Sequence, residues 1–179
     1  MKKIFTKIVL LTFLAISIAA CSSDSDSSSP SSSNTISLTL NGVDQVATVV
    51  SASLIKSEMS NEKLLQIYAE NEDYKFEVNF FGEYSANNTL PTGDYVYNDT
   101  TVEGFFYVSY KVNGNSYGMH SPDSGNLTIS SINASTLKVS GTFNQVLTGG
   151  GDLNGETLPT TLTVTNGTFN NIKYEVITY

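Results

Sequence analysis

The stretch KLLQIYAENEDYKFEVNFFG, residues 63–82, decides the fold of this chain. In its second half, aromatic and aliphatic residues stand at every second position and polar residues stand between them. The first set is Tyr74, Phe76, Val78 and Phe80, and the second set is Lys75, Glu77 and Asn79. A period of two is typical of a strand with one buried and one solvated face. The polar residues at 72 and 73 predict a turn between two antiparallel strands.

Strands of the same kind continue on both sides of this hairpin. TISLTL (35–40) leads through Asn41-Gly42 into VDQVATVVSASLI (43–55), and Asn-Gly between alternating runs is a strong hairpin signal. Further strands are expected at 90–98, 103–113, 116–121, 126–132, 136–147, 160–166 and 167–179. We therefore predict an all-β fold of about ten strands, either an antiparallel two-sheet sandwich or a flattened barrel.

One segment has a different pattern. Residues 57–66, SEMSNEKLLQ, could hold a single helical turn, with Ser57 or Ser60 as its N-cap. No other part of the folded region suggests a helix.

The first 20 residues have the pattern of a secretion signal. Three lysines precede an apolar run at 8–20, which is shorter than the roughly 20 residues that cross a membrane as a helix. The run ends in Ile18-Ala19-Ala20-Cys21, which resembles the lipobox of bacterial lipoproteins. That resemblance implies cleavage between Ala20 and Cys21 and a diacylglycerol on the Cys21 thiol. Two or three acyl chains are enough for stable anchoring, whereas one chain is marginal.

A tether is expected between the lipid and the folded region. Residues 22–34, SSDSDSSSPSSSN, include nine serines and cannot bury enough surface to become ordered. The predicted organisation is therefore a signal peptide at 1–20, a lipidated cysteine and flexible tether at 21–34, and a β-domain at 35–179. Ser23, Asp24, Ser25 and Asp26 loosely resemble the acidic export signal of surface-exposed Bacteroidota lipoproteins. This slightly favours the cell surface of the outer membrane over its periplasmic face.

Charge excludes one class of partner. Loss of the signal leaves six lysines and no arginine against 17 acidic residues, a net charge of −11. Nucleic-acid binding requires a basic surface that neutralises phosphates, and this chain has none. Anionic headgroups should be repelled as well, so the only expected membrane contact is the lipid on Cys21.

The C-terminal third carries a family resemblance. GNLTISSINASTLKVSGTF (125–143) and TLTVTNGTFNNIKY (161–174) are similar to the closing strands of a group of uncharacterised Bacteroidota lipoproteins, and SLTLNGVDQVAT (37–48) suits the start of their domains. The shared motifs are SGTF and TNGTF, which belong to strands and turns. The resemblance implies an all-β lipoprotein domain and no particular activity.

A nucleophile pattern occurs in an unsuitable setting. Residues 114–118, GNSYG, match G-x-S-x-G, but the nucleophile elbow needs a helix after the serine and SPDSG (121–125) cannot form one. Ser116 and His120, the only histidine, would lie roughly 13 Å apart along a strand, beyond hydrogen-bond reach. No catalytic serine is expected.

Metal and cofactor sites are not expected either. A single histidine and a cysteine committed to lipid cannot build a zinc site. DLNGE (152–156) lacks the ligand spacing of a calcium loop, and the acids at 70, 72 and 73 suit a solvated turn. Glycoside hydrolysis needs two carboxylates at a set separation, for which Glu77, Glu83, Glu103 and Glu175 are the candidates, but nothing in the sequence pairs them. We expect a protein that is not an enzyme.

The surplus of aromatic residues is the main functional signal. Adjacent residues on a strand point to opposite faces, so Phe105, Phe106 and Tyr107 cannot all enter one core, and the same holds for Phe80 and Phe81. Some aromatic surface should therefore be exposed or covered by a partner. The candidate binding aromatics are Tyr95, Tyr97, Phe105, Tyr107 and Tyr110.

Three functions remain open at this stage. The first is a non-catalytic binding or structural module that contacts a glycan or another envelope protein. The second is a lipocalin-like carrier of an apolar small molecule, and the third is a small glycoside hydrolase.

Asp99-Thr100-Thr101 also resembles the short O-glycosylation motif of Bacteroidota, which would place a glycan on Thr100. The oligomeric state has no sequence signal.

Overall fold

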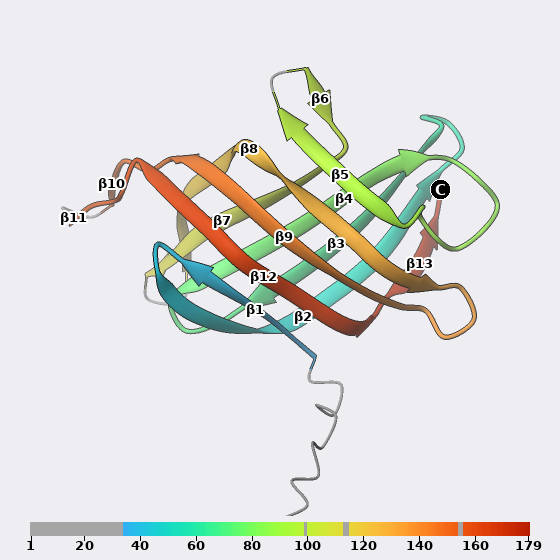
Figure 1. Ribbon diagram of the computed structural model, residues 1–179, viewed down its shortest axis with the longest axis horizontal. Coiled ribbons are helices and arrows are strands. Elements are labelled where there is room, and N and C mark those ends of the chain that lie inside the picture. The colour runs from blue at the N-terminus through green and yellow to red at the C-terminus, as the bar shows by residue number, and fades with distance from the viewer. Residues whose placement is uncertain (1–33, 99, 113–114, 154–155) are drawn as a thin grey trace, which may run out of the picture. The chain divides into compact units, whose positions relative to one another are not determined.

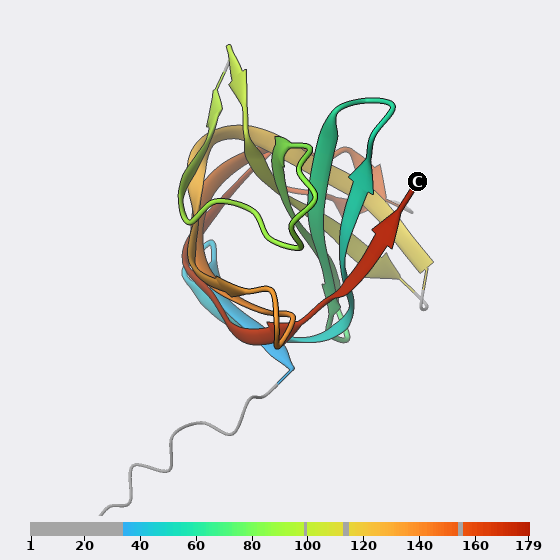
Figure 2. The ribbon, with the colours of Figure 1, turned by 90° about the vertical axis from the view of Figure 1, so that its right-hand side faces the viewer.

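The computed structural model describes residues 34–98, 100–112, 115–153 and 156–179, with their side chains except those of 112–117 and 152–156. Eight strands form a closed antiparallel barrel, which appears as a ring of strands in Figure 2. The all-β prediction is confirmed, and the barrel is the architecture that forms. Within the described ranges, no helix is long and apolar enough to cross a membrane.

Each barrel strand pairs with the next along the chain, and the last pairs with the first (Figure 1). The barrel strands are β1 (Thr35–Leu40), β2 (Val43–Ser57), β3 (Glu62–Glu70), β4 (Tyr74–Glu83), β7 (Gly104–Val112), β8 (Asn115–Asn133), β9 (Lys138–Gly149) and β12 (Thr161–Lys173). Closure gives each of these strands a partner on both sides over at least part of its length.

Three short strands add to the sheet of the barrel. β5 (Gly93–Asn98) pairs with β8, β6 (Thr101–Val102) pairs with β5, and β13 (Glu175–Thr178) runs parallel to the second half of β2. β10 (Asp152–Leu153) and β11 (Glu156–Thr157) form a separate two-stranded hairpin. The hairpin formed by β5 and β6 lies beside the start of β7, because the backbone N–H of Glu103 donates to the Val96 carbonyl at 3.0 Å.

The long strand β8 differs from the sequence expectation of two strands at 116–121 and 126–132. The SPDSG segment stays in the ladder with β9, with a bulge between Pro122 and Ser124. On its other side, β8 pairs with β7 up to His120 and with β5 from Gly125 onward. Pro122 thus lies in the part of β8 whose second edge has no partner strand, and edges of this kind are where strands tolerate proline.

The segment at 57–66 forms a turn and no helix. The Ser57 hydroxyl accepts a hydrogen bond from the backbone N–H of Ser60 at 3.3 Å, as an N-cap would. The chain then reverses at Asn61, which has a φ of 57°, and enters β3 at Glu62. Pairing of Glu62–Glu70 with β2 and β4 prevails over the local helical signal.

Phenylalanine rings fill the interior. The rings of Phe106 and Phe143 lie 4.7 Å apart, those of Phe143 and Phe169 lie 6.5 Å apart, and those of Phe169 and Phe80 lie 5.8 Å apart, measured between centroids. These residues come from β7, β9, β12 and β4, so the contacts run across the barrel. All four are fully buried. The barrel is therefore held by a packed core.

The two GTF motifs fit together as reciprocal pairs. Gly141 lies opposite Phe169 in the β9–β12 register, and Gly167 lies opposite Phe143. A Cβ on Gly141 would stand 2.4 Å from the Phe169 ring, and a Cβ on Gly167 would stand 2.4 Å from the Phe143 ring. Each phenylalanine ring therefore occupies the space that the glycine on the other strand leaves free.

Two inward-facing lysines close one end of the barrel. Lys56 and Lys63 face each other across β2 and β3 and are only 6% and 1% exposed. The Lys63 ammonium donates to Ser85, to Asn87 and to the Thr89 carbonyl, while Lys56 donates to the Ala86 carbonyl at 2.8 Å. Burial and the neighbouring Lys56 lower the pKa of Lys63. The β4–β5 connection is thereby held across the barrel end, where Figure 2 shows it.

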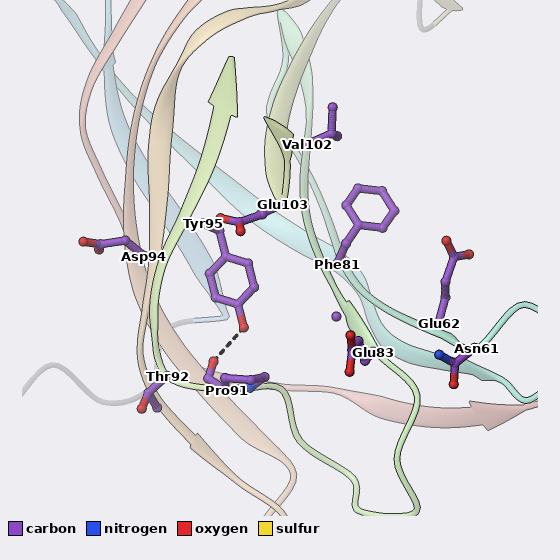
Figure 3. A pocket seen from close by; sticks show the side chains of 11 residues that line it. Asn61, Glu62, Phe81, Glu83, Pro91, Thr92, Asp94, Tyr95, Val102 and Glu103 are labelled. Carbon is purple, nitrogen blue, oxygen red and sulfur yellow. Dashed lines mark hydrogen bonds between the residues drawn. The ribbon is translucent and has the colours of Figure 1, made fainter. Parts of the chain in front are cut away.

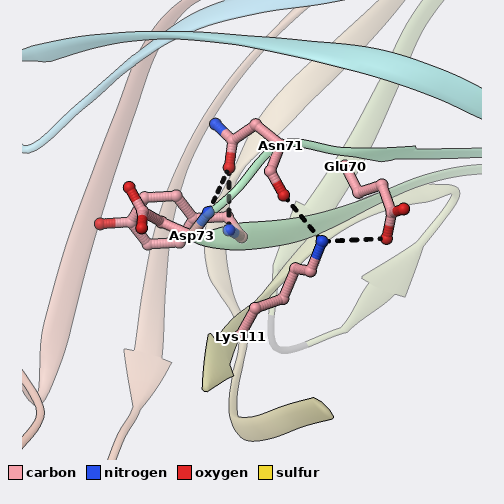
Figure 4. Close-up of polar contacts among 5 residues, drawn as sticks. Glu70, Asn71, Asp73 and Lys111 are labelled. Carbon is pink, nitrogen blue, oxygen red and sulfur yellow. Dashed lines mark hydrogen bonds and ion pairs between the residues drawn. The ribbon is translucent and has the colours of Figure 1, made fainter. Parts of the chain in front are cut away.

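The acidic turn between β3 and β4 is organised by local hydrogen bonds and one ion pair (Figure 4). The Asn71 side-chain oxygen accepts hydrogen bonds from the backbone N–H groups of Asp73 and Tyr74 at 3.0 and 2.8 Å. Lys111 donates to the Asn71 carbonyl at 2.8 Å and lies 3.4 Å from the Glu70 carboxylate. The turn is a structural junction between β3, β4 and β7.

The fit between Gly167 and Phe143 can be tested by substitution. We expect Gly167→Ala to lower the free energy of unfolding by about 1–3 kcal/mol, because its methyl group would overlap the Phe143 ring. Urea denaturation measures the change. Thr165→Ala, at an exposed position of the same strand, is the control. Equal stability of the two variants would contradict the proposed fit.

Tyr95 gives the fold a dependence on alkaline pH. Burial, followed by the nearby Glu103 charge, raises the pKa of Tyr95 from 10.0 to about 12. A raised pKa means that the folded state holds the proton more tightly, so this contribution is complete below about pH 10 and is lost as the pH rises through about 12. Urea midpoints measured across this range should fall more steeply for the wild type than for Tyr95→Phe. If the urea midpoints of the wild type and of Tyr95→Phe fell equally steeply with pH, the raised pKa of Tyr95 would not be the cause.

Candidate functional site

Four aromatic side chains gather on the outer surface of the barrel, and we call them the outer aromatic face. The face consists of Phe81 on β4, Tyr97 on β5, and Phe105 and Tyr107 on β7. The Phe105 ring lies at its centre, with centroid distances of 5.3 Å to Phe81, 6.5 Å to Tyr97 and 4.6 Å to Tyr107. All four side chains are partly exposed.

Strand alternation explains why these rings lie outside. Phe106 points into the core and is fully buried, so its neighbours Phe105 and Tyr107 point outward. Phe80 is likewise fully buried, and its neighbour Phe81 points outward. The expectation that these consecutive aromatics divide between two faces is confirmed.

The other two candidate aromatics turn inward. Tyr95 is 6% exposed, its ring lies 5.1 Å from Phe80, and its hydroxyl donates to the Pro91 carbonyl at 2.7 Å. Tyr110 packs against the core, with its ring 5.3 Å from that of Tyr74. Of the five candidate binding aromatics, the structure therefore brings three together on the outer aromatic face, namely Tyr97, Phe105 and Tyr107. Phe81 is the fourth ring of this face and was not among the candidates.

A hydrogen-bonded polar group adjoins the outer aromatic face. Glu77 Oε1 accepts hydrogen bonds from Gln66 Nε2 and Asn79 Nδ2, both at 2.9 Å, and Gln66 Nε2 also donates to Asn79 Oδ1 at 3.1 Å. Asn79 is only 1% exposed although it stands on the outward side of β4. These bonds hold the Glu77 carboxylate in a fixed position.

Two tyrosines stand on either side of Glu77. The antiparallel register places Tyr68 of β3 and Tyr107 of β7 directly opposite Glu77 on its two neighbouring strands. Burial, the Glu77 charge and a hydrogen bond to Glu77 raise the pKa of Tyr68. Burial and the charges of Tyr97 and Glu77 raise the pKa of Tyr107. Gln66, Tyr68 and Asn79 carry no sequence signal that marks them as site residues.

A pocket of about 460 Å³ opens beside the outer aromatic face. Phe81 belongs to both, and Figure 3 shows its ring across the pocket from Tyr95. Four acidic residues contribute to the lining, namely Glu62, Glu83, Asp94 and Glu103. The surface around the aromatic rings is therefore acidic and hydrogen-bonding in character.

The candidate hydrolase carboxylates lie in three places. Glu83 and Glu103 line the pocket, Glu77 lies on the outer surface, and Glu175 starts β13. The Glu103 carboxylate accepts a hydrogen bond from the Val96 backbone N–H at 3.1 Å, which gives it a structural role at the β5–β7 junction.

His120 lies inside the barrel. It is fully buried, its Nε2 lies 2.5 Å from the Pro159 carbonyl oxygen, and its ring is 5.6 Å from that of Tyr110. The side chain of Ser116 and those of 152–156 lie outside the described set. Among the described residues, no group of three or more His, Cys, Asp or Glu side chains could hold a metal ion.

Several predicted sites fall elsewhere. Ala20, Cys21 and the segment Ser23–Asp26 lie outside the described residues, and so does Asp99. Thr100 is exposed, and its backbone N–H and hydroxyl both donate to the Asn98 side chain at 2.9 Å. An exposed turn is the setting that the glycosylation motif requires.

Comparisons of this chain with known protein families, with curated proteins and with solved structures find no match.

Proposed function

We propose that this chain is a lipid-anchored, non-catalytic envelope protein that binds a glycan on its outer aromatic face. The observation that carries the proposal is the placement of Phe81, Tyr97, Phe105 and Tyr107 together on the solvent side of a barrel whose interior is already filled. Core packing does not require these four rings. Contiguous aromatic surface on a soluble domain commonly marks an interaction site.

The polar group beside the rings favours a glycan as the ligand. The apolar C–H face of a sugar ring packs on an aromatic ring, while its hydroxyl groups need donors and acceptors at the edge. Gln66 and Glu77 supply such groups, and their mutual hydrogen bonds fix them before a ligand arrives. Binding then costs little side-chain ordering. A protein partner would instead favour a broader apolar centre.

The carrier and the hydrolase find less support. A lipocalin-like carrier needs an open interior, but the rings of Phe80, Phe106, Phe143 and Phe169 meet across the barrel. A glycosidase needs two carboxylates free to act on one bond. Of the four carboxylates that line the pocket, Glu103 accepts a hydrogen bond from the backbone of β5 and Asp94 accepts one from the Thr128 hydroxyl at 2.6 Å.

The anchor completes the proposal. The lipobox ending at Cys21, the serine-rich segment at 22–34 and the Ser23–Asp26 signal favour a domain held at the cell surface of the outer membrane. The resemblance to Bacteroidota lipoproteins supports the same location. A glycan-binding module at this surface would meet polysaccharide from the surroundings or from neighbouring cells.

Glycan binding is tested with ring-deletion variants. We expect the purified full-length protein to bind a subset of an oligosaccharide array, and Phe105→Ala or Tyr107→Ala to weaken that binding by about tenfold or more, because each variant removes a stacking surface. Tyr179→Ala, which removes a 74% exposed ring away from this face, is the matched control. Absence of any bound glycan, or equal binding by all variants, would refute the proposal.

The anchor is tested in cells. We expect the wild type to incorporate labelled fatty acid and to fractionate with the outer membrane, and Cys21→Ser to lose the label because the acceptor thiol is gone. Ser22→Ala serves as the control and should keep the label. Labelling of Cys21→Ser would contradict the anchor. Protease treatment of intact cells should release the domain, and full protection would place it on the periplasmic face instead.

A further inference from the structure

The row Tyr68–Glu77–Tyr107 suggests a more specific ligand for the outer aromatic face. These three residues stand side by side on β3, β4 and β7, with the carboxylate between two tyrosines. Side chains directly opposite each other on neighbouring strands have Cβ atoms about 5 Å apart, so both tyrosines are close enough to contact a group bound at Glu77.

The Glu77 charge has no basic partner among the described side chains. The one ion pair in the described part of the chain joins Lys111 to Glu70. Lys75 stands two residues before Glu77 on β4 and is exposed, but it forms no ion pair with Glu77. The groups that donate hydrogen bonds to the Glu77 carboxylate, from Gln66 and Asn79, are both uncharged.

Room remains at Glu77 for one more donor. A carboxylate offers about four acceptor positions, and the donors from Gln66 and Asn79 both bind Oε1. A cation bound there would be attracted by the uncompensated negative charge of Glu77. It would also be attracted by the π faces of the tyrosine rings, which bind ammonium groups. The chain is also strongly acidic overall, which raises the local concentration of cationic ligands and repels anionic ones.

We propose that Tyr68, Glu77 and Tyr107 recognise a protonated amino group on the bound glycan, so that this face prefers amino sugars with a free amine. This inference rests on the proposed glycan-binding function. The ammonium donates a charge-assisted hydrogen bond to Glu77 and lies between the two tyrosines, while the sugar ring extends over Phe105. Glu77 is then the specificity-determining residue, and Phe105 contributes affinity for any sugar.

The experiment compares three ligands of similar length on the purified full-length protein by calorimetry: an oligomer of glucosamine, its fully N-acetylated form and a neutral oligomer of glucose. We expect the free-amine form to bind about tenfold more tightly than the acetylated form, equivalent to about 1.4 kcal/mol. Added salt should reduce the difference, because the discriminating contact is an ion pair.

The variants separate the amine contact from the aromatic face. Glu77→Gln should lower the affinity for the free-amine form to that for the acetylated form, because the glutamine oxygen still accepts the hydrogen bonds from Gln66 and Asn79 but carries no charge. Glu175→Gln makes the same charge change at an exposed position of β13 and should keep the preference. Matched thermal melts of Glu77→Gln and wild type verify that the fold is intact.

The possible failures are distinguishable. Equal binding of amine and acetylated forms by the wild type, with loss of both in Phe105→Ala, would overturn the amine contact and leave the glycan-binding face in place. A preference that persists in Glu77→Gln would also overturn it. Absence of binding to every oligomer tested would overturn this inference and, together with a blank array, the proposed function as well.

Discussion

The contact of phenylalanine rings across the barrel is the constraint on which the rest of the structure depends. Phe80, Phe106, Phe143 and Phe169 come from four strands and meet in the interior, and two of them fit only because glycines stand opposite them. Phe76 and Tyr95 pack against these rings in the same interior, with centroid distances of 5.8 Å from Phe76 to Phe106 and 5.1 Å from Tyr95 to Phe80. Strand alternation then sends the next aromatic residues to the solvent side, where they form the outer aromatic face.

Two buried lysines and the β4–β5 connection close one end of the barrel. Lys56 and Lys63 point inward, where an unpaired ammonium would be costly. The β4–β5 connection turns carbonyl groups toward both, and the Tyr174 hydroxyl binds the Asn88 carbonyl at 2.6 Å. The same connection leads into the pocket beside Phe81, so closure of the barrel also positions one wall of that pocket.

The outer aromatic face is built on regular strands, which suits recognition of a defined ligand. Three of its four rings stand on β4 and β7, whose backbones are fixed by the barrel ladder, and Tyr97 stands on β5, which pairs with β8. The Gln66–Glu77–Asn79 hydrogen bonds fix the polar groups in the same way. A site held by rigid elements loses little entropy when it binds. This rigidity makes a directional contact such as that of an amine with Glu77 selective.

The sequence by itself determined the all-β class, the position of most strands and the division of Phe105, Phe106 and Tyr107 between two faces, because these follow from alternation with a period of two. It also carries the local patterns from which a signal peptide and a lipobox are predicted. Only the tertiary structure decided that the strands close into a barrel, that SPDSG continues β8, and that two lysines point inward. It alone placed Tyr95 and Tyr110 inside and set Tyr68 and Tyr107 beside Glu77. These outcomes depend on strand register and closure, which join residues far apart in the chain and leave no local trace.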